Sequence, residues 1–280
     1  MDDIIKAPVA SFDQALQGRL AGVQVSSTDG QPGAEMEIVI RGANSLTQSN
    51  APLYVVDGFP IEDFSSAALS ASDIASMTVL KDASATAIYG SRGANGVIII
   101  ETKQGQVGKP QVTYNGTFGF QQVTKQMELM NPYEFVVYQI ERDPSNLDAY
   151  LTNPGRTLDY YRTHPGIDWQ DRLFRNAFVH MHNISVSGGT KQTRYAISGA
   201  AVGQDGVIDN SGYKKYQGRL SLTQQLNKRA QLSLNVNYTE DKSFGQTSSA
   251  ALSTSNSYAT YLMYRTWAYK PVFSKDIPEV

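Results

Sequence analysis

The 280-residue sequence has no cysteine, only three histidines and no long run of apolar residues. Without cysteine it can form no disulfide, so an exported form of the chain must obtain its stability elsewhere. No stretch of about eighteen apolar residues occurs, which excludes a transmembrane helix but not a β-barrel, whose strands alternate polar and apolar residues. The 24 lysines and arginines are balanced by 26 aspartates and glutamates, and a net charge of −2 gives no electrostatic basis for binding nucleic acid.

The segment LKDASATAIYGSRGANGVIII, from Leu80 to Ile100, predicts a strand end, a short helix, a glycine-rich turn and a buried strand in succession. Asp82 is a natural N-cap for a helix of mostly small residues that ends at Tyr89. Three glycines, Gly90, Gly93 and Gly96, permit the sharp turns that follow, with Gly90 suited to the left-handed residue after a helix. The apolar run from Val97 to Ile100 then predicts a strand buried on both faces.

Two segments further upstream continue this mixed α/β pattern. Ala10 to Val25 predicts an amphipathic helix with Gly22 at its end. Its expected apolar face carries Phe12, Leu16 and Leu20. Pro52 to Ile61 predicts a strand, a tight turn at Asp57 and Gly58, and a return strand. A turn role for Asp57 outweighs the alternative of a catalytic acid, because aspartate before glycine is typical of such turns.

Taken in chain order, the segments Ala10 to Val25, Pro52 to Ile61 and Leu80 to Ile100 closely resemble the plug domain of SusC/RagA-type TonB-dependent outer-membrane transporters. Ile38 to Gly42, between the first and the second of them, belongs to the same resemblance. The resemblance extends from about Ala10 to Lys103, and the string from Leu80 to Ile98 is too long for chance agreement. It implies a globular plug inside a large β-barrel that gates nutrient uptake across the outer membrane of a Gram-negative bacterium. The residues of the plug signature in this chain are Arg41, Gly42, Asp57, Gly58, Asp82, Tyr89, Gly90, Arg92, Gly93 and Gly96.

After about Lys103 the sequence changes to long polar and apolar alternation, which is typical of two-faced strands. Ala230 to Thr239 is the clearest case, since every second residue is apolar or aromatic. Four other segments alternate similarly: Gln111 to Gln121, Asn183 to Ser187, Arg194 to Ala201 and Tyr216 to Thr223. In a barrel, the apolar face of each strand contacts lipid and the polar face lines the lumen. We therefore predict an α+β plug at residues 1–105, followed by the first five or six antiparallel strands of an incomplete β-barrel at residues 106–280.

The connections between the predicted strands alternate in length. Short turns at residues 188–192 and 227–229 contrast with long connections at residues 123–177 and 205–212. An outer-membrane barrel has this asymmetry, with the short turns on the periplasmic side, although a soluble sandwich can show it by accident.

Two stretches outside the strands favour helices. Asn131, Pro132 and Glu134 predict the start of a helix in the first long connection. That helix either lines a substrate entrance or packs on the rim of the barrel, and the second interpretation is favoured. Ser253 to Tyr269 fits a helix slightly better than a strand.

Candidate catalytic chemistry is sparse. His180 and His182 share one face of a predicted strand, but no third zinc ligand is obvious, so a structural role near a membrane interface is favoured over a metal site. The glycine-rich turn is not a phosphate loop, because a strand and not a helix follows it. The sequence therefore predicts no catalytic residue, no metal, no cofactor and no enzyme. The 16 tyrosines suit interface girdles and the core better than sugar-stacking platforms.

Two plug arginines suggest how the plug is held. A charge beside buried strands is costly unless it is paired or reaches water. We therefore expect Arg41 and Arg92 to contact neighbouring plug loops or the barrel wall and to hold the plug in place. A purely local role, in which each arginine ties a plug turn to itself, is an equal alternative.

The length after Lys103 supports only about five or six strands, at about 10 residues per strand plus loops. We therefore expect the chain to be the N-terminal portion of a longer transporter, lacking the TonB-box segment and the small N-terminal β-sandwich extension that the resemblance places upstream. Met1, Asp2 and Asp3 are not followed by a charged and then apolar segment, so we also expect a secretory leader to be missing. For the intact protein, the resemblance implies energised import of an oligosaccharide or peptide. The partners that it implies are a SusD-like surface lipoprotein, the TonB complex and membrane lipid. The alternative is a soluble β-rich ligand-binding protein.

Overall fold

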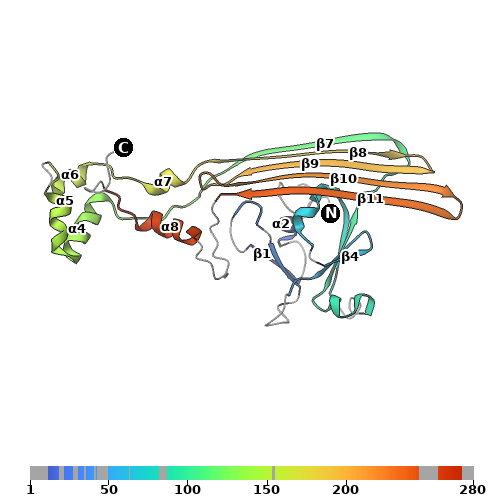
Figure 1. The fold of residues 1–280 in the computed structure, drawn as a ribbon, viewed down its shortest axis with the longest axis horizontal. Coiled ribbons are helices and arrows are strands. Elements are labelled where there is room, and N and C mark those ends of the chain that lie inside the picture. Colours follow the sequence, from blue (N-terminus) through green and yellow to red (C-terminus); the bar gives the residue numbers. More distant parts are fainter. Residues whose placement is uncertain are drawn as a thin grey trace. The chain divides into compact units, whose positions relative to one another are not determined.

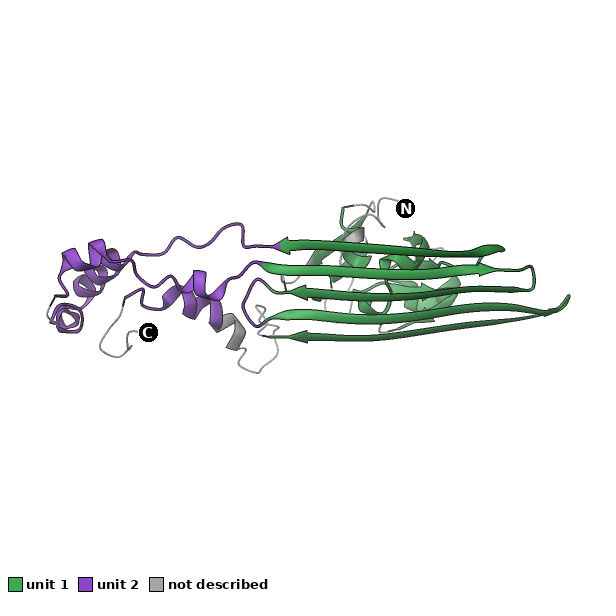
Figure 2. Ribbon diagram, turned by 90° about the horizontal axis from the view of Figure 1, so that it is seen from above, with its two compact units in different colours: residues 1–120, 177–206, 211–245 green, residues 121–176, 207–210, 246–280 purple. Residues whose placement is uncertain are grey.

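The computed structural model describes residues 12–18, 22–27, 31–34, 36–40, 42, 50–62, 64–81, 87–152, 155–245 and 258–272. The chain forms two compact units, each built from separate stretches of sequence (Figure 2). Unit 1 comprises residues 1–120, 177–206 and 211–245, and unit 2 comprises residues 121–176, 207–210 and 246–280. Among the described residues, no helix is long and apolar enough to cross a bilayer.

The first part of unit 1 contains two small sheets. Its strands are β1 (Val23–Ser27), β2 (Met36–Ile40), β3 (Leu53–Val56), β4 (Phe59–Ile61), β5 (Ile74–Leu80) and β6 (Val97–Thr102). Among the described residues, the helix α2 (Phe12–Leu16) and the 3-10 turns η1 (Ser66–Ala68), η2 (Ala71–Asp73) and η3 (Gly90–Gly93) accompany them, and residues 87–89 before η3 are α-helical. Strands β1 and β2 pair antiparallel, and the second sheet has the order β4-β3-β6-β5 with β3 and β6 parallel.

Strand β6 is the centre of the plug core. Ile98 and Ile100 are fully buried in one apolar cluster that also contains Phe12 and Leu16. Val97 packs in a second cluster with Leu53 and Val55 of β3. Burial on both sides of the strand confirms the prediction from the apolar run.

The predicted helix from Ala10 to Val25 is wrong in its C-terminal part. The described helix ends at Leu16, and Val23 to Val25 belong to strand β1, where they pair with residues 38–40. Gly18 and Gly22 both have left-handed backbone angles, φ 71° and 70°, which the α-helix does not tolerate. The β-branched valines then favour the pleated strand.

Five long strands form the second part of unit 1. They are β7 (Gly108–Gln121), β8 (Ala177–Gly189), β9 (Thr193–Asp205), β10 (Gly212–Asn227) and β11 (Ala230–Phe244). They lie in the order β11-β10-β9-β8-β7 in one open sheet, and β8 to β11 pair antiparallel (Figure 1). This arrangement confirms the prediction of a plug followed by the first strands of an incomplete barrel.

The sheet has two chemically different faces. On β10, Lys215, Gln217 and Arg219 are buried, whereas Tyr216, between the first two, is 57% exposed on the opposite face. The outward face continues across the neighbouring strands with exposed apolar side chains, among them Ile184, Ile197, Leu232, Leu234 and Val236. The predicted alternation is therefore correct, with polar residues buried and apolar residues exposed.

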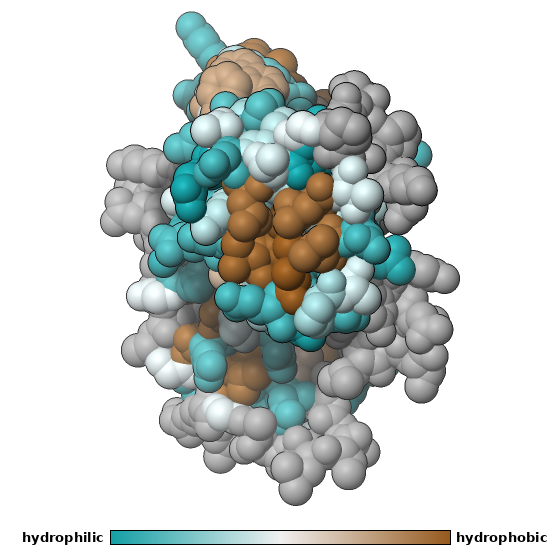
Figure 3. Space-filling model, turned by 90° about the vertical axis from the view of Figure 1, so that its left-hand side faces the viewer, coloured by the Kyte–Doolittle hydropathy of each residue, from teal (hydrophilic) through white to brown (hydrophobic). Residues whose placement is uncertain are grey.

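Unit 2 is helical. Its helices are α4 (Pro132–Arg142), α5 (Leu147–Leu151), α6 (Leu158–Thr163), α7 (Trp169–Leu173) and α8 (Tyr258–Ala268), with the 3-10 turn η4 (Pro144–Asn146) before α5. Val136, Tyr150, Tyr161 and Val272 form its core. On the side of the molecule drawn in Figure 3, apolar side chains gather in a patch bordered by hydrophilic ones. Exposed apolar residues of unit 2 include Leu147 and Leu158.

Both helix predictions in this unit are confirmed. Asn131 caps α4 through a complete capping box, in which its Oδ1 accepts from the Glu134 backbone N–H at 2.9 Å. The Glu134 carboxylate in turn accepts from the Asn131 backbone N–H at 3.0 Å. Helix α8 covers the described part of the segment from Ser253 to Tyr269 except Tyr269 itself.

Candidate functional site: the contact between plug and wall

The plug and the polar face of the long sheet meet at Asp57. This residue and Gly58 form the turn between β3 and β4, with φ of 49° and 88°, which confirms the predicted turn with two left-handed residues. The turn points the Asp57 carboxylate back along the neighbouring strand β6. There Oδ1 accepts from the Thr102 backbone N–H at 2.8 Å, and Oδ2 accepts from the Thr102 hydroxyl at 2.6 Å.

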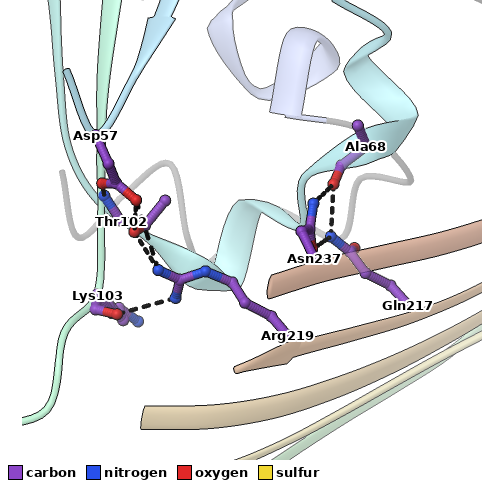
Figure 4. Close-up of polar contacts among 7 residues, drawn as sticks. All are labelled: Asp57, Ala68, Thr102, Lys103, Gln217, Arg219 and Asn237. Carbon is purple, nitrogen blue, oxygen red and sulfur yellow. Dashed lines mark hydrogen bonds and ion pairs between the residues drawn. The ribbon is translucent and has the colours of Figure 1, made fainter. Parts of the chain in front are cut away.

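Arg219 of β10 completes this cluster from the wall side (Figure 4). Its Nη2 lies 3.8 Å from Asp57 Oδ2 and donates to Thr102 Oγ1, while its Nη1 donates to the Lys103 carbonyl oxygen at 2.9 Å. The Arg219 and Asp57 side chains are only 5% and 13% exposed. An ion pair this well buried is screened little by solvent, and removal of one partner leaves an uncompensated charge.

A second contact centres on the carbonyl oxygen of Ala68, at the end of the turn η1. It accepts from Gln217 Nε2 at 2.9 Å and Asn237 Nδ2 at 2.5 Å (Figure 4). It also accepts from Thr239 Oγ1 at 3.3 Å. Gln217 on β10 and Thr239 on β11 face each other in register. A carbonyl that ends a helical turn has no partner within the turn, so the two wall strands supply the missing donors.

Charges of opposite sign face each other beside these contacts. Asp73, at the end of η2, is 4% exposed and bonds to Ser198 of β9. Burial raises the pKa of the Asp73 carboxyl, and the Ser198 hydrogen bond and the charges of Arg219, Lys103 and Lys215 oppose that rise. Lys215 of β10, 2% exposed, lies near the carboxylates of Asp13 and Asp73 of the plug. Lys215 also lies near Asp241 of the neighbouring wall strand β11, and Asp73 near Lys103 of the plug, so acids and bases of both parts form one mixed cluster.

One plug turn packs so closely on the wall that it requires glycine. Gly33 has φ 76°, and a Cβ added there would overlap the ring of Tyr213 on β10. Tyr213 is itself 3% exposed, because this turn covers it.

The residues of the predicted plug signature lie in different places. Arg41 and Asp82 lie outside the described residues. Gly42, Gly90 and Gly96 have left-handed φ of 91°, 63° and 92°, as expected for turn glycines. Tyr89 precedes η3, and Gly93 is buried at its end. Only Asp57 of the described set takes part in the contacts with the wall given above.

Arg92 makes a local contact within the plug. Its Nη1 lies 3.2 Å from Glu62 Oε1, and the two side chains are 55% and 72% exposed. An ion pair this exposed contributes little to stability. Arg92 therefore contacts a neighbouring plug loop, and its described ion pair does not involve the wall.

Sequence reasoning missed Arg219, Thr102, Gln217 and Asn237 as members of one site. A signal was present for Arg219, because it is a charged residue in the middle of the polar face of a predicted strand. No local pattern indicates its partners, since Arg219 and Lys103 are 116 residues apart in sequence.

The two histidines lie in an aromatic cluster on the outward face of the sheet. Tyr114 Oη lies 2.7 Å from His182 Nδ1, and the ring centroid of Phe118 lies 5.2 Å from that of His182. Phe178 and His180 continue the row, with ring centroids 5.7 Å apart. In the part of the chain that the structure describes, no group of three metal-ligating residues occurs.

Residues 1–97 match the family model described as TonB-dependent Receptor Plug Domain. TonB-dependent receptor P3 of Formosa agariphila is 40% identical over 230 residues, which are 82% of this chain and 21% of that protein. TonB-dependent receptor SusC of Bacteroides thetaiotaomicron is 36% identical over 229 residues, covering 79% and 22% of the two chains.

The structural comparison agrees with the sequence comparison. The structure of the RagAB peptide transporter superposes with a TM-score of 0.75 at 31% identity, over 87% of this chain and 30% of that chain. The chain belongs to the SusC/RagA type of TonB-dependent receptors, and it spans about a fifth of the length of the curated relatives it matches.

Proposed function

We propose that this chain is the plug and the first wall strands of a transporter that imports a bulky nutrient, an oligosaccharide or a peptide, with energy from TonB. The plug corresponds to residues 1–105 and the wall strands to residues 106–280. The observation that carries this proposal is the sheet with two faces, whose polar face binds the plug while its other face exposes apolar side chains such as Leu234 and Val236, 45% and 48% exposed. A sheet of this kind fits a wall between lipid and a plugged lumen.

The proposed location is the outer membrane of a Gram-negative bacterium. The proposed partners of the intact protein are a SusD-like surface lipoprotein, the TonB complex acting through a segment N-terminal to the plug, the nutrient and membrane lipid. The names of the relatives support this assignment, since SusC and the RagAB peptide transporter are among them. No enzymatic role is proposed, because the charged residues of the site bind one another across the interface.

The experiment uses the intact gene in its own bacterium. A deletion strain is compared with the parent and with a complemented strain for growth on single oligosaccharides or on peptides, with and without a protonophore. We expect the protein in the outer-membrane fraction and loss of uptake of one nutrient class in the deletion strain, restored by complementation and abolished by the protonophore. A soluble protein, or unchanged uptake of every nutrient tested, would contradict the proposal and favour the soluble β-rich binding protein.

A further inference from the structure

A cavity of unit 2, lined by both polar and apolar side chains, has a volume of about 540 Å³. Four stretches of that unit surround it: the extended segment 126–131, helix α4, residues 166–170 and the end of α8 with Pro271. Its volume is in the range of small-molecule sites. None of the contacts between plug and wall involves these residues, so the cavity is a separate feature.

The lining is rich in aromatic rings. Both tryptophans of the chain, Trp169 and Trp267, line the cavity together with Phe135, Tyr138 and Tyr269. The ring centroids of Trp169 and Tyr269 lie 5.0 Å apart at an interplanar angle of 83°. Tyr138 and Tyr269 are 45% and 50% exposed, so their rings are accessible to a ligand.

The protein itself satisfies the polar edges of the two indoles. Trp169 Nε1 donates to the Lys270 carbonyl oxygen at 2.8 Å, and Trp267 Nε1 donates to Gln170 Oε1 at 3.2 Å. These bonds fix the rings, so what each indole offers a ligand is its apolar surface. A fixed ring loses little conformational freedom on binding.

Gln170 holds the cavity together. Its side chain is buried, its Nε2 donates to the Met127 carbonyl oxygen at 2.8 Å, and its Oε1 accepts from the Met127 backbone N–H at 3.0 Å. The same Oε1 accepts from Trp267. One amide thus joins the extended segment, α7 and α8, and prepares the cavity before any ligand binds.

The charges of the lining select the ligand. Two carboxylates, Glu128 and Asp168, line the cavity, and among the described residues no lysine or arginine does. Asp168 Oδ1 already accepts from the backbone N–H groups of Gln170 and Asp171 at 2.8 and 3.1 Å. An anionic ligand would meet these carboxylates without a compensating cation. A simple ammonium group would fill only part of the volume.

We infer that this cavity binds a neutral oligosaccharide. A sugar ring has apolar C–H faces that fit the flat aromatic lining and hydroxyl groups at its edge. The Glu128 carboxylate and the Gln139 amide, both in the lining, supply acceptors and donors for those hydroxyls. The inference rests on the proposed function, in which a bulky nutrient is the cargo, and it selects the oligosaccharide over the peptide.

Calorimetric titration of the detergent-solubilised intact protein tests the inference without requiring transport. The probes are neutral hexasaccharides of glucose, mannose and xylose, a sulfated hexasaccharide and a lysine-rich hexapeptide. We expect at least one neutral hexasaccharide to bind, with no heat from the sulfated one. Tyr138→Ala and Tyr269→Ala should each weaken that binding by about tenfold or more. Leu147→Ala, which alters a residue of similar exposure in the same unit but outside the lining, should leave it unchanged.

Three results would overturn the inference: no binding of any neutral hexasaccharide, binding that neither tyrosine variant weakens, or binding of the peptide alone. Near-ultraviolet circular dichroism establishes that each variant is folded, and two separate tyrosines keep the test valid if one variant misfolds. Uptake that continues in both tyrosine variants together with unaltered hexasaccharide binding would reject the cavity and leave the proposed function intact. A protein that binds the sugar in detergent but supports no uptake in cells would reject the proposed function alone.

Discussion

At the scale of single residues, Asp57 has two tasks, of which the sequence shows only one. Its left-handed backbone closes the turn between β3 and β4, and its carboxylate binds Thr102 and Arg219. The backbone task is visible in the sequence, because aspartate followed by glycine is typical of such turns. The side-chain task depends on a strand that follows more than a hundred residues later.

The ion pair of Asp57 and Arg219 predicts a strong coupling between the two residues. In the intact protein, Arg219→Met should lower the free energy of unfolding of the plug by about 3–5 kcal/mol, because Asp57 is then buried without its partner. The double variant with Asp57→Asn should cost less than the sum of the single variants, and guanidinium titration of the detergent-solubilised protein measures all three. Lys214→Met, on the exposed face of the same strand, is the control. Additive costs would show that the two charges do not interact.

The turn itself predicts a backbone effect at Gly58. Gly58→Val should destabilise the plug by about 1–2 kcal/mol, because φ of 88° is strained for a β-branched residue. Space is not the cause, since nothing lies within 4 Å of an added Cβ. Gly58→Asn is the matched control, because asparagine tolerates left-handed angles. Equal stability of the valine and asparagine variants would contradict this explanation.

At the scale of the elements, each strand of the long sheet shows one chemistry to the plug and another to the outside. Leu234→Arg on the outward face of β11 should destabilise the intact protein by about 2–4 kcal/mol if it lies near the membrane midplane. Asn235→Arg, on the adjacent residue and the opposite face, should cost much less, because it faces the lumen. Unfolding titrations in lipid vesicles compare the two. A tolerated arginine at residue 234 would contradict a lipid-facing surface.

Helix α4 predicts a smaller and local effect. Asn131→Ala removes the side chain that caps the helix and should cost about 1 kcal/mol. Hydrogen exchange should therefore accelerate at the first amides of α4 and remain unchanged in β8. Asn131→Asp, which keeps the capping oxygen, is the control. Acceleration throughout unit 2 would show that Asn131 supports more than this one helix end.

The features that the sequence predicted correctly are local ones. The capping box at Asn131, the turn at Asp57 and the alternation of the wall strands each depend on residues close together in sequence. The helix predicted to reach Val25 was wrong because pairing with β2 decided the conformation of that segment. The contacts around Arg219 and Ala68 could not be predicted, because they join segments 116 to 171 residues apart, and only the fold brings these together.

At the scale of the whole molecule, two groups of polar contacts join the plug to the wall, and polar contacts can be exchanged for water more readily than apolar ones. The Arg219 cluster and the Ala68 carbonyl provide most of the described hydrogen bonds between plug and wall. In the proposed transporter, such an interface suits a plug that stays in place at rest and is displaced during transport. If Arg219 seats the plug, its loss should loosen the plug without preventing the barrel from closing.

Planar-bilayer conductance of the intact transporter tests this expectation. Arg219→Ala should make the channel leaky to small hydrophilic solutes and ions, because the variant removes the bonds to Thr102, Lys103 and Asp57 together. Arg92→Ala is the matched control, since it removes an arginine whose partner, Glu62, lies in the plug itself at an exposed site. We expect its conductance to equal that of the unaltered protein. A leak in the Arg92 variant with none in the Arg219 variant would show that Arg92 in the plug, and not Arg219 of the wall, holds the plug in place.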